Sequence, residues 1–424
     1  MVRLRLYEIS GLGLAVAWLL LFAVEVLADA VIVFGYGATG RVFVDRVLKY
    51  RDELDLVIVD IDPDKLAQAQ ERLKGRASVH YLSSIDEVTD DHWQDAVFIQ
   101  ELVTEDVPVK QALLAKAVLQ LAQHQNPAPV GSNTSSIPAT LLARQLPDDL
   151  KARVSVNHLY SPHSAAAEVA TLDDSPAAQA TKDAVEAFNE SLGIRSFRLS
   201  NDSLPIRDQL GHSFNRIWFR LKEHFMDMAE EGVVNYPMVD LAFMLVYGRP
   251  LGIFGTMDVI GLGTAIHIRD VWFELGGVGS RMPTSIIEQW QEGRRFYSEG
   301  DRPADVEWLA PQREANLDGM QRYAEAASLA DAGWQEKTKQ LVKELLASAR
   351  HLSSREKDMA LQQWFDDDEQ LQYATFLVAA VTLQEYRHTI LENKVLSVED
   401  ADALLGILTG QSYFLSRMEK VFQE

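Results

Sequence analysis

Three polar residues whose side chains can take part in proton transfer follow apolar runs that are typical of buried strands. Glu101 follows the run 96–99, Ser135 follows 129–132, and His158 follows 152–156. Parallel strands end at one rim of their sheet, and ligands bind beyond those ends. A histidine there can accept and return a proton near neutrality, because imidazole has an unperturbed pKa of about 6.5. The pattern predicts an acid–base site at His158, and a loop histidine with a structural role is the alternative.

A glycine-rich turn lies between a short apolar run at 31–34 and a segment with helical periodicity. Its residues are Gly35, Tyr36, Gly37, Ala38, Thr39 and Gly40, which form a G-x-G-x-x-G pattern. The first glycine permits the tight turn, the second lets the backbone approach a pyrophosphate, and the third lets the helix pack close to the strand. The helix N-terminus offers free N–H groups to the phosphates. The turn therefore predicts a dinucleotide site, and an ordinary strand–helix turn is the alternative.

An acidic residue follows the next strand pattern. The apolar run 56–59 ends at Asp60, at the distance from the glycine turn where such folds bind the adenosine ribose. A carboxylate there accepts hydrogen bonds from the ribose hydroxyls and repels a 2′-phosphate. The predicted cofactor is therefore NAD, and we expect discrimination against NADP.

Strand and helix patterns alternate as far as about residue 200, and helical patterns alone follow. This order predicts an α/β fold, with an N-terminal Rossmann doubly wound parallel sheet followed by an all-α C-terminal domain. We divide the chain into an apolar N-terminal extension (1–30), an NAD-binding domain (31–203), a helical substrate and dimerisation domain (204–298) and a further helical region (299–424). We expect a homodimer through the helical domain.

The helical part contains two similar segments. Residues 231–234 precede 239–242 and Gly248, and residues 392–396 precede 399–402 and Gly410. Each segment reads as a helix end, a turn and an acid-capped helix that ends in glycine, a residue favoured at helix C-termini. The region 299–424 is therefore interpreted as a second copy of one helical unit, and a coincidence of helix caps is the alternative.

Composition excludes several classes of function. The chain has 424 residues, 47% of them hydrophobic, which is enough for two or three domains with a sizeable core. Its net charge of −22 argues against nucleic-acid binding, because phosphate backbones would be repelled. The absence of cysteine excludes disulfides, thiolate catalysis and Cys-ligated zinc, and we expect no metal site.

The N-terminus has the form of a secretory signal. Two arginines precede an apolar stretch at 11–24, and Ala28-Asp29-Ala30 follows. The stretch is short for a membrane span of about 20 residues. Cleavage after Ala30 would leave the first strand at the new terminus and separate the protein from intracellular NAD. We therefore expect a cytoplasmic protein, and membrane association or export through 11–24 is the alternative.

The chain resembles the L-3-hydroxyacyl-CoA dehydrogenase family. The matching pieces follow the family order and are VIVFGYGATG, VIVD, QELVTEDVPVK, GSNTSSIP, NHLYSP with a later EV, DQLGHSFNRI and RPLGIFGTMDVIGLGT. Together they cover residues 31 to about 270. The NTSS element and the Asn–Arg pair after D-x-x-G are the more specific of these pieces.

The resemblance implies a role for each of six residues. His158 corresponds to the family's acid/base, Glu168 to the carboxylate that supports it, and Ser135 and Asn215 to the residues that contact the reacting oxygen. Glu105 and Lys110 correspond to cofactor contacts, and a solvated first helical turn is their alternative. Oxidation of a secondary alcohol needs a base for the hydroxyl proton while hydride leaves for the nicotinamide, which agrees with these roles.

Three features depart from the family pattern. The family's asparagine before Pro162 is Ser161, and the loop from Pro162 to Glu168 is about two residues shorter than usual. The segment between Asp60 and Glu101 lacks the longer insertion in which the family carries a helical hairpin that grips coenzyme A.

The predicted function is NAD-dependent oxidation of an L-3-hydroxyacyl-CoA, or the reverse reduction of a 3-oxoacyl-CoA. The substrate is thus a small acyl compound, with a CoA thioester as one form. One alternative is a dehydrogenase of a free small 3-hydroxy acid, of the sugar-acid or carnitine type. Another is a non-catalytic NAD-binding protein.

Overall fold

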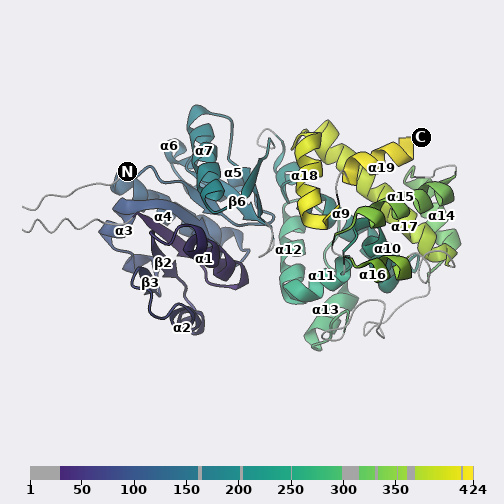
Figure 1. The fold of residues 1–424 in the computed structure, drawn as a ribbon, viewed down its shortest axis with the longest axis horizontal. Helices are drawn as coiled ribbons and strands as arrows, with labels where there is room; N and C mark the ends of the chain where they lie inside the picture. Colours follow the sequence, from purple (N-terminus) through teal and green to yellow (C-terminus); the bar gives the residue numbers. More distant parts are fainter. Residues whose placement is uncertain are drawn as a thin grey trace, which may run out of the picture.

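The computed structural model describes residues 29–160, 165–200, 204–249, 251–297, 315–329, 333–350, 352–360, 368–411 and 414–423. Figure 1 shows two lobes, one built around a sheet and one of helices alone. The predicted fold class, a Rossmann sheet followed by helices, is confirmed. Most of the apolar N-terminal extension, residues 1–28, lies outside the described residues.

One sheet of eight strands forms the first lobe, in the order β3-β2-β1-β4-β5-β6-β7-β8. The strands are β1 (Ala30–Phe34), β2 (Asp55–Val59), β3 (Val79–Leu82), β4 (Ala96–Glu101), β5 (Val130–Ser132), β6 (Val154–Leu159), β7 (Ala166–Ala170) and β8 (Arg195–Arg198). Among these described strands, β6 and β7 pair antiparallel and all other neighbours pair parallel. β1 begins at Ala30, one residue before the predicted boundary, and β7 is a strand that the sequence analysis did not predict.

Helices cover both faces of the sheet. Their bounds are α1 (Ala38–Tyr50), α2 (Pro63–Arg72), α3 (Asp90–Asp95), α4 (Val107–Gln123), α5 (Ala139–Leu142), α6 (Asp148–Lys151) and α7 (Pro176–Ser191). Successive strand residues point to opposite faces, so Val31 and Val33 of β1 pack with α1 and α7, whereas Ile32 and Phe34 pack with α4 and α5. The central strands are therefore buried on both sides, which explains their continuous apolar runs.

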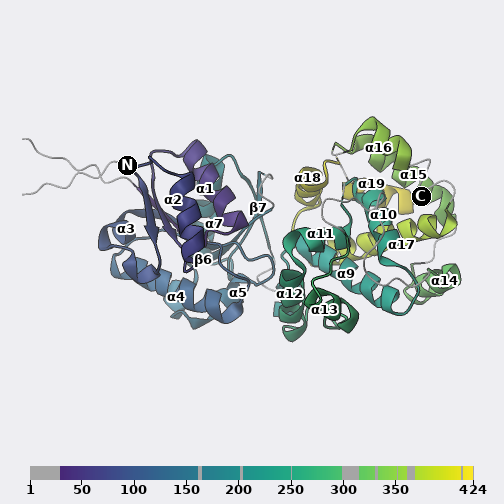
Figure 2. The ribbon, with the colours of Figure 1, turned by 90° about the horizontal axis from the view of Figure 1, so that it is seen from below.

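The second lobe contains the remaining helices. They are α8 (Ile206–Gln209), α9 (Phe214–Glu230), α10 (Tyr236–Tyr247), α11 (Ile253–Ile260), α12 (Leu262–Glu274), α13 (Thr284–Gln291), α14 (Leu317–Ala326), α15 (Trp334–Ser348), α16 (Ser354–Met359), α17 (Glu369–Tyr386), α18 (Val398–Thr409) and α19 (Phe414–Gln423), with a π-helical turn at Arg387–Glu392. Helices α12 and α18 lie on the side that faces the sheet in both views (Figures 1 and 2). None of the described helices combines the length and the apolar character that a membrane crossing requires.

α10 and α18 share several features at matching positions. Asn235 and Ser397 cap their N-termini through side-chain oxygens. Asp240 lies within α10 and accepts hydrogen bonds from the first backbone N–H groups of α11, and Asp402 does the same from α18 to α19. Both helices end at a glycine in the left-handed region, with φ of 59° at Gly248 and 73° at Gly410.

Candidate active site

The glycine turn has the shape that the sequence pattern requires. Gly35 has a φ of +99°, and a Cβ atom there would collide with the carbonyl oxygen of Leu102. A Cβ on Gly40 would collide with the carbonyl oxygen of Gly35, so this glycine permits the close packing of α1. A Cβ on Gly37 would meet no atom within 4 Å. The turn is therefore open at the position where a pyrophosphate approaches and crowded where the helix meets the strand.

Asp60 lies beside this turn. The residue is 7% exposed, and its carboxylate accepts hydrogen bonds from the backbone N–H of Tyr36 at 2.7 Å and of Asp62 at 2.9 Å. Ala38, Thr39 and Gly40 form the first residues of α1, where the N–H groups have no partner within the helix. The two N–H donors fix the carboxylate and leave acceptor capacity for a ribose diol. These residues fit the adenosine half of NAD.

A buried charged cluster lies at the ends of β4 and β5. Lys110 of α4 is 1% exposed, and its Nζ lies 2.7 Å from Glu101 Oε1 and 3.5 Å from Glu105 Oε2. Burial works to lower the pKa of Lys110, but the two glutamates outweigh it and raise that pKa. Ser132 donates its hydroxyl to Glu101 Oε2 at 2.5 Å. Lys110 is thus a buried ion-pair partner, and the alternative of a solvated helix turn is wrong for it.

Glu105 binds the loop that carries Ser135. Its Oε1 accepts hydrogen bonds from Thr134 Oγ1 at 2.6 Å, Ser136 Oγ at 2.6 Å and the backbone N–H of Ser135 at 3.0 Å. Burial would raise the pKa of Glu105, but Lys110 and the two hydroxyls hold it below the usual range. The carboxylate is therefore charged and shapes this loop.

His158 and Glu168 stand opposite each other on the paired strands β6 and β7. His158 Nδ1 lies 3.5 Å from Glu168 Oε2 and has no hydrogen bond to another described residue. Burial would raise the pKa of the fully buried Glu168, but His158, His212 and Ser213 lower it. The antiparallel pairing of β6 with β7 therefore brings the two side chains to ion-pair distance. Ser161, Pro162 and His163, in the loop between these strands, lie outside the described residues.

Glu168 has further partners that the sequence analysis missed. Tyr160 donates its hydroxyl to Oε2 at 2.6 Å, and Ser213 donates its backbone N–H to Oε1 at 3.1 Å and its hydroxyl to the same oxygen. Tyr160 is two residues beyond His158, and the period of a strand could have indicated that both face one side. Ser213 precedes the first residue of α9, where no periodic pattern marks it.

Ser135 and Asn215 meet beside this pair. Asn215, in the first turn of α9, donates its Nδ2–H to the carbonyl oxygen of Ser135 at 3.3 Å. Both side chains are half-buried. The neighbouring His212 is fully buried, its Nε2 lies 2.9 Å from the carbonyl oxygen of Thr134, and its ring centre is 5.5 Å from that of His158. Burial lowers the pKa of His212.

The structure thus brings together the four residues predicted for the chemistry, at the junction of the two lobes. A base, a carboxylate behind it and two polar groups beside it could take a proton from a bound alcohol. No group of three or more His, Asp or Glu side chains in the described ranges is arranged to hold a metal ion. The geometry agrees with acid–base chemistry at this junction.

Comparisons with known proteins agree with this geometry. The family model described as 3-hydroxyacyl-CoA dehydrogenase, NAD binding domain, matches residues 30–202. The model described as 3-hydroxyacyl-CoA dehydrogenase, C-terminal domain, matches residues 211–302.

Curated relatives are similar over part of the chain. The fatty acid oxidation complex subunit alpha of Ectopseudomonas oleovorans is 25% identical over 241 residues, which are 56% of this chain and 30% of that protein. The subunit of the same name from Pseudomonas savastanoi is 27% identical over 203 residues, which are 47% of this chain and 26% of that protein. The chain thus spans less than a third of these relatives' length.

A solved structure shows the same fold over nearly the whole chain. The 3-hydroxybutyryl-CoA dehydrogenase from Escherichia coli K12 superposes with a TM-score of 0.59 at 17% identity. The superposition covers 93% of this chain and 94% of that one, so it includes the helices beyond residue 302.

Proposed function

Because the chain belongs to the 3-hydroxyacyl-CoA dehydrogenase family, we propose that this NAD-dependent oxidoreductase oxidises the 3-hydroxyl of an L-3-hydroxyacyl thioester or catalyses the reverse reduction. The observation that carries the proposal is the pairing of His158 with Glu168 beside Ser135 and Asn215. The bound nicotinamide supplies the hydride acceptor.

His158 is the proposed acid/base. Because its Nδ1 faces Glu168, the Nε2 side of the ring is the one left for the substrate hydroxyl. When the imidazole takes the proton, the buried carboxylate 3.5 Å away stabilises the positive charge. Tyr160 and Ser213 hold that carboxylate in place, so it can orient the ring without moving. The Ser135 hydroxyl and the Asn215 amide are the proposed hydrogen-bond partners of the reacting oxygen.

The cofactor contacts divide into two groups. The Gly35–Gly40 turn and Asp60 are proposed to hold the pyrophosphate and the adenosine ribose. Glu105 and Lys110 are proposed to act through the Ser135 loop, which they fix at the nicotinamide side of the rim.

A free small 3-hydroxy acid is the second candidate substrate. The segment between β2 and β3 holds the single helix α2, so the described chain has no helical hairpin at that place to grip coenzyme A. The test measures NADH formation with a panel of L-3-hydroxyacyl-CoAs and free 3-hydroxy acids. Turnover of the thioesters alone would support the first proposal, and turnover of the free acids alone would overturn it in favour of the second.

We also propose that α17 to α19 are a second copy of the unit α9 to α11. The matching caps, buried aspartates and terminal glycines of α10 and α18 support this. α17 packs along α10, so the second copy covers a face of the first. A homodimer would therefore use another surface of the helical lobe, and light scattering at several concentrations tests for it.

A further inference from the structure

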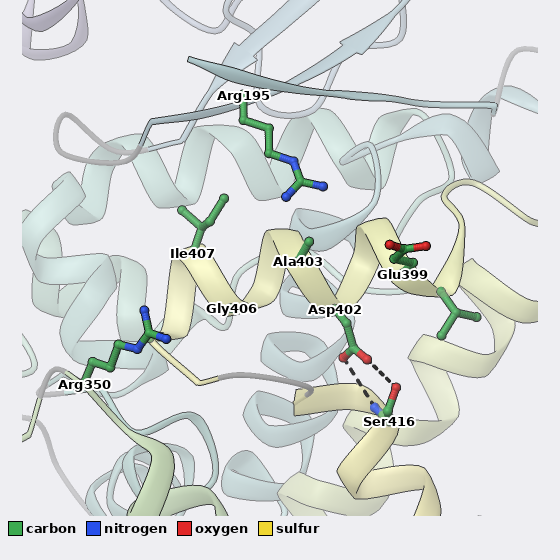
Figure 3. Close-up of a pocket in the computed structure, with 10 residues that line it drawn as sticks. Arg195, Arg350, Glu399, Asp402, Ala403, Gly406, Ile407 and Ser416 are labelled. Atoms are coloured by element: carbon green, nitrogen blue, oxygen red, sulfur yellow. Dashed lines mark hydrogen bonds between the residues drawn. The ribbon is translucent and has the colours of Figure 1, made fainter. Parts of the chain in front are cut away.

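A large cavity lies between the edge strand β8 and helix α18, and we call it the β8–α18 pocket. Its volume is about 850 Å³, within the range of small-molecule sites. The residues used below are Arg195, Arg350, Glu399, Asp402, Ala403 and Ile407. Figure 3 shows Arg195 reaching in from the strand and Arg350 from the opposite side, with Ala403 and Ile407 between them on α18.

The pocket has an apolar floor with cationic groups at its sides. Ala403 and Ile407 are one turn apart on α18, and Ile407 is 36% exposed. Arg350 follows α15 and has no hydrogen bond or ion pair to another described residue. Arg195 contacts Asp400 at 3.3 Å, but a guanidinium has five N–H donors, and this contact uses few of them. An apolar floor between two arginines suits a flat apolar group that carries phosphates.

The acidic residues of the pocket do not contradict an anionic ligand. Asp402 already accepts hydrogen bonds from the backbone N–H and the hydroxyl of Ser416 and from the N–H of Leu415 at the start of α19. Glu399 remains as an acceptor at the far end of the pocket from Arg350 (Figure 3). A nucleotide has an amine and hydroxyls that can donate hydrogen bonds to carboxylates, and phosphates that can accept them from arginines. A pocket lined by both acidic and basic side chains therefore fits a nucleotide.

The pocket lies at the rim that carries the catalytic pair. His158 is opposite Glu168, and Ala166, two residues earlier in β7, is opposite Arg195. β7 and β8 start at the rim where β6 ends. Arg195, the first residue of β8, therefore lies at the same rim as His158. Two strand spacings and two residues separate its Cα from that of His158 by roughly 12 Å. A long flexible thioester arm could therefore join the two places.

We propose that the β8–α18 pocket binds the phosphorylated adenosine end of a CoA thioester whose acyl group lies at His158. This inference rests on the proposed function, because it names the site that binds the nucleotide part of that substrate. The proposed CoA-binding site lies on α18, in the proposed second helical unit, whereas the family pattern has its CoA contacts after the second strand. Arg350 and Arg195 would bind the phosphates, and Ala403 and Ile407 would contact the base.

The test compares L-3-hydroxybutyryl-CoA with its pantetheine thioester, which lacks the nucleotide. Wild-type protein should show at least about tenfold higher kcat/KM for the CoA form, the effect expected for charge-assisted hydrogen bonds. Arg350→Gln should remove most of that preference while kcat/KM for the pantetheine form stays unchanged. Ala403→Trp, which fills the floor and removes no charge, should act in the same way. The control is Arg294→Gln, an exposed arginine paired with Glu292.

Direct binding separates this inference from the proposed function. Calorimetry with adenosine 3′,5′-bisphosphate in saturating NADH should show binding to wild type and to Arg294→Gln, and weakened binding to Arg350→Gln. If that pattern holds while no thioester is oxidised, the pocket assignment stands and the proposed function fails. If wild type uses both thioesters equally, or if Arg350→Gln and Ala403→Trp leave the preference intact, the proposed function stands and the pocket assignment is overturned.

Discussion

Replacement of His158 by glutamine should abolish turnover while leaving the fold and NADH binding nearly intact. General acid–base catalysis contributes about 10²–10⁴-fold in rate, and a glutamine cannot take up a proton near neutrality. The change breaks no hydrogen bond of Nδ1 to a described residue. Its structural cost is the loss of ring contacts with Tyr160 and His212, about 1 kcal/mol.

Glu168→Gln should lower the stability more, and the turnover less, than His158→Gln does. The carboxylate accepts from the Tyr160 hydroxyl and from the N–H and hydroxyl of Ser213. An amide offers one accepting oxygen and turns its NH₂ toward one of these donors, which leaves buried groups unpaired at a cost of about 1–3 kcal/mol. The rate should fall less than in His158→Gln, because the base itself remains. The two variants therefore rank in opposite orders for activity and stability.

Three measurements on each variant decide the matter: initial rates, NADH titration by fluorescence, and urea denaturation. NADH affinity should survive in both, because the glycine turn and Asp60 belong to the first half of the sheet. Near-normal turnover by His158→Gln would refute the assignment, and the double variant with His212→Gln would then show whether the neighbouring ring is the base. Loss of NADH binding by His158→Gln would show that the residue is structural.

Three further outcomes are expected. Asp60→Ser should lower the preference in kcat/KM for NAD over NADP by about tenfold or more, since a carboxylate repels the 2′-phosphate, and an unchanged ratio would exclude Asp60 as its source. Burial raises the pKa of Asp240 to about 7, so as pH rises the unfolded chain releases this proton before the folded protein does. The unfolding free energy of wild type relative to Asp240→Asn should therefore fall between about pH 4 and 7 and stay constant above pH 7. An increase of this difference with pH would contradict the assignment. Lys110→Met leaves Glu101 and Glu105 without their buried cation and should cost about 3–5 kcal/mol in urea denaturation, whereas a loss under 1 kcal/mol would show that the cluster is not coupled as described.

The parts of the site that follow strand ends could be predicted from sequence because they depend on local patterns. The glycine turn, Asp60, Ser135 and His158 each stand at a fixed offset from an apolar run, and parallel strands bring such positions to one rim. Glu168 was found only through family resemblance, since β7 is a short run of alanines with one valine whose composition does not favour a strand.

The buried charges were harder to predict because they depend on contacts between distant segments. Lys110 looks like an ordinary helical lysine in the sequence, and only the fold places its Nζ against Glu101 and Glu105. Ser213 is likewise far from Glu168 in sequence, and its role arises where α9 meets the sheet. The shared features of α10 and α18, on which the proposed repeat rests, were visible in the sequence because helix caps and terminal glycines are local signals.

The antiparallel pairing of β6 with β7 explains how this sheet can hold the proposed acid–base pair. A parallel strand after β6 would start at the opposite edge and reach the rim only at its C-terminal end. β7 instead starts at the rim, so Glu168, the third of its five residues, stands opposite His158, near the end of β6. The connection between them is short, and the backbone pairing of the two strands fixes their separation. The same reversal makes β8 start at this rim, which brings Arg195 to Asp400 of α18.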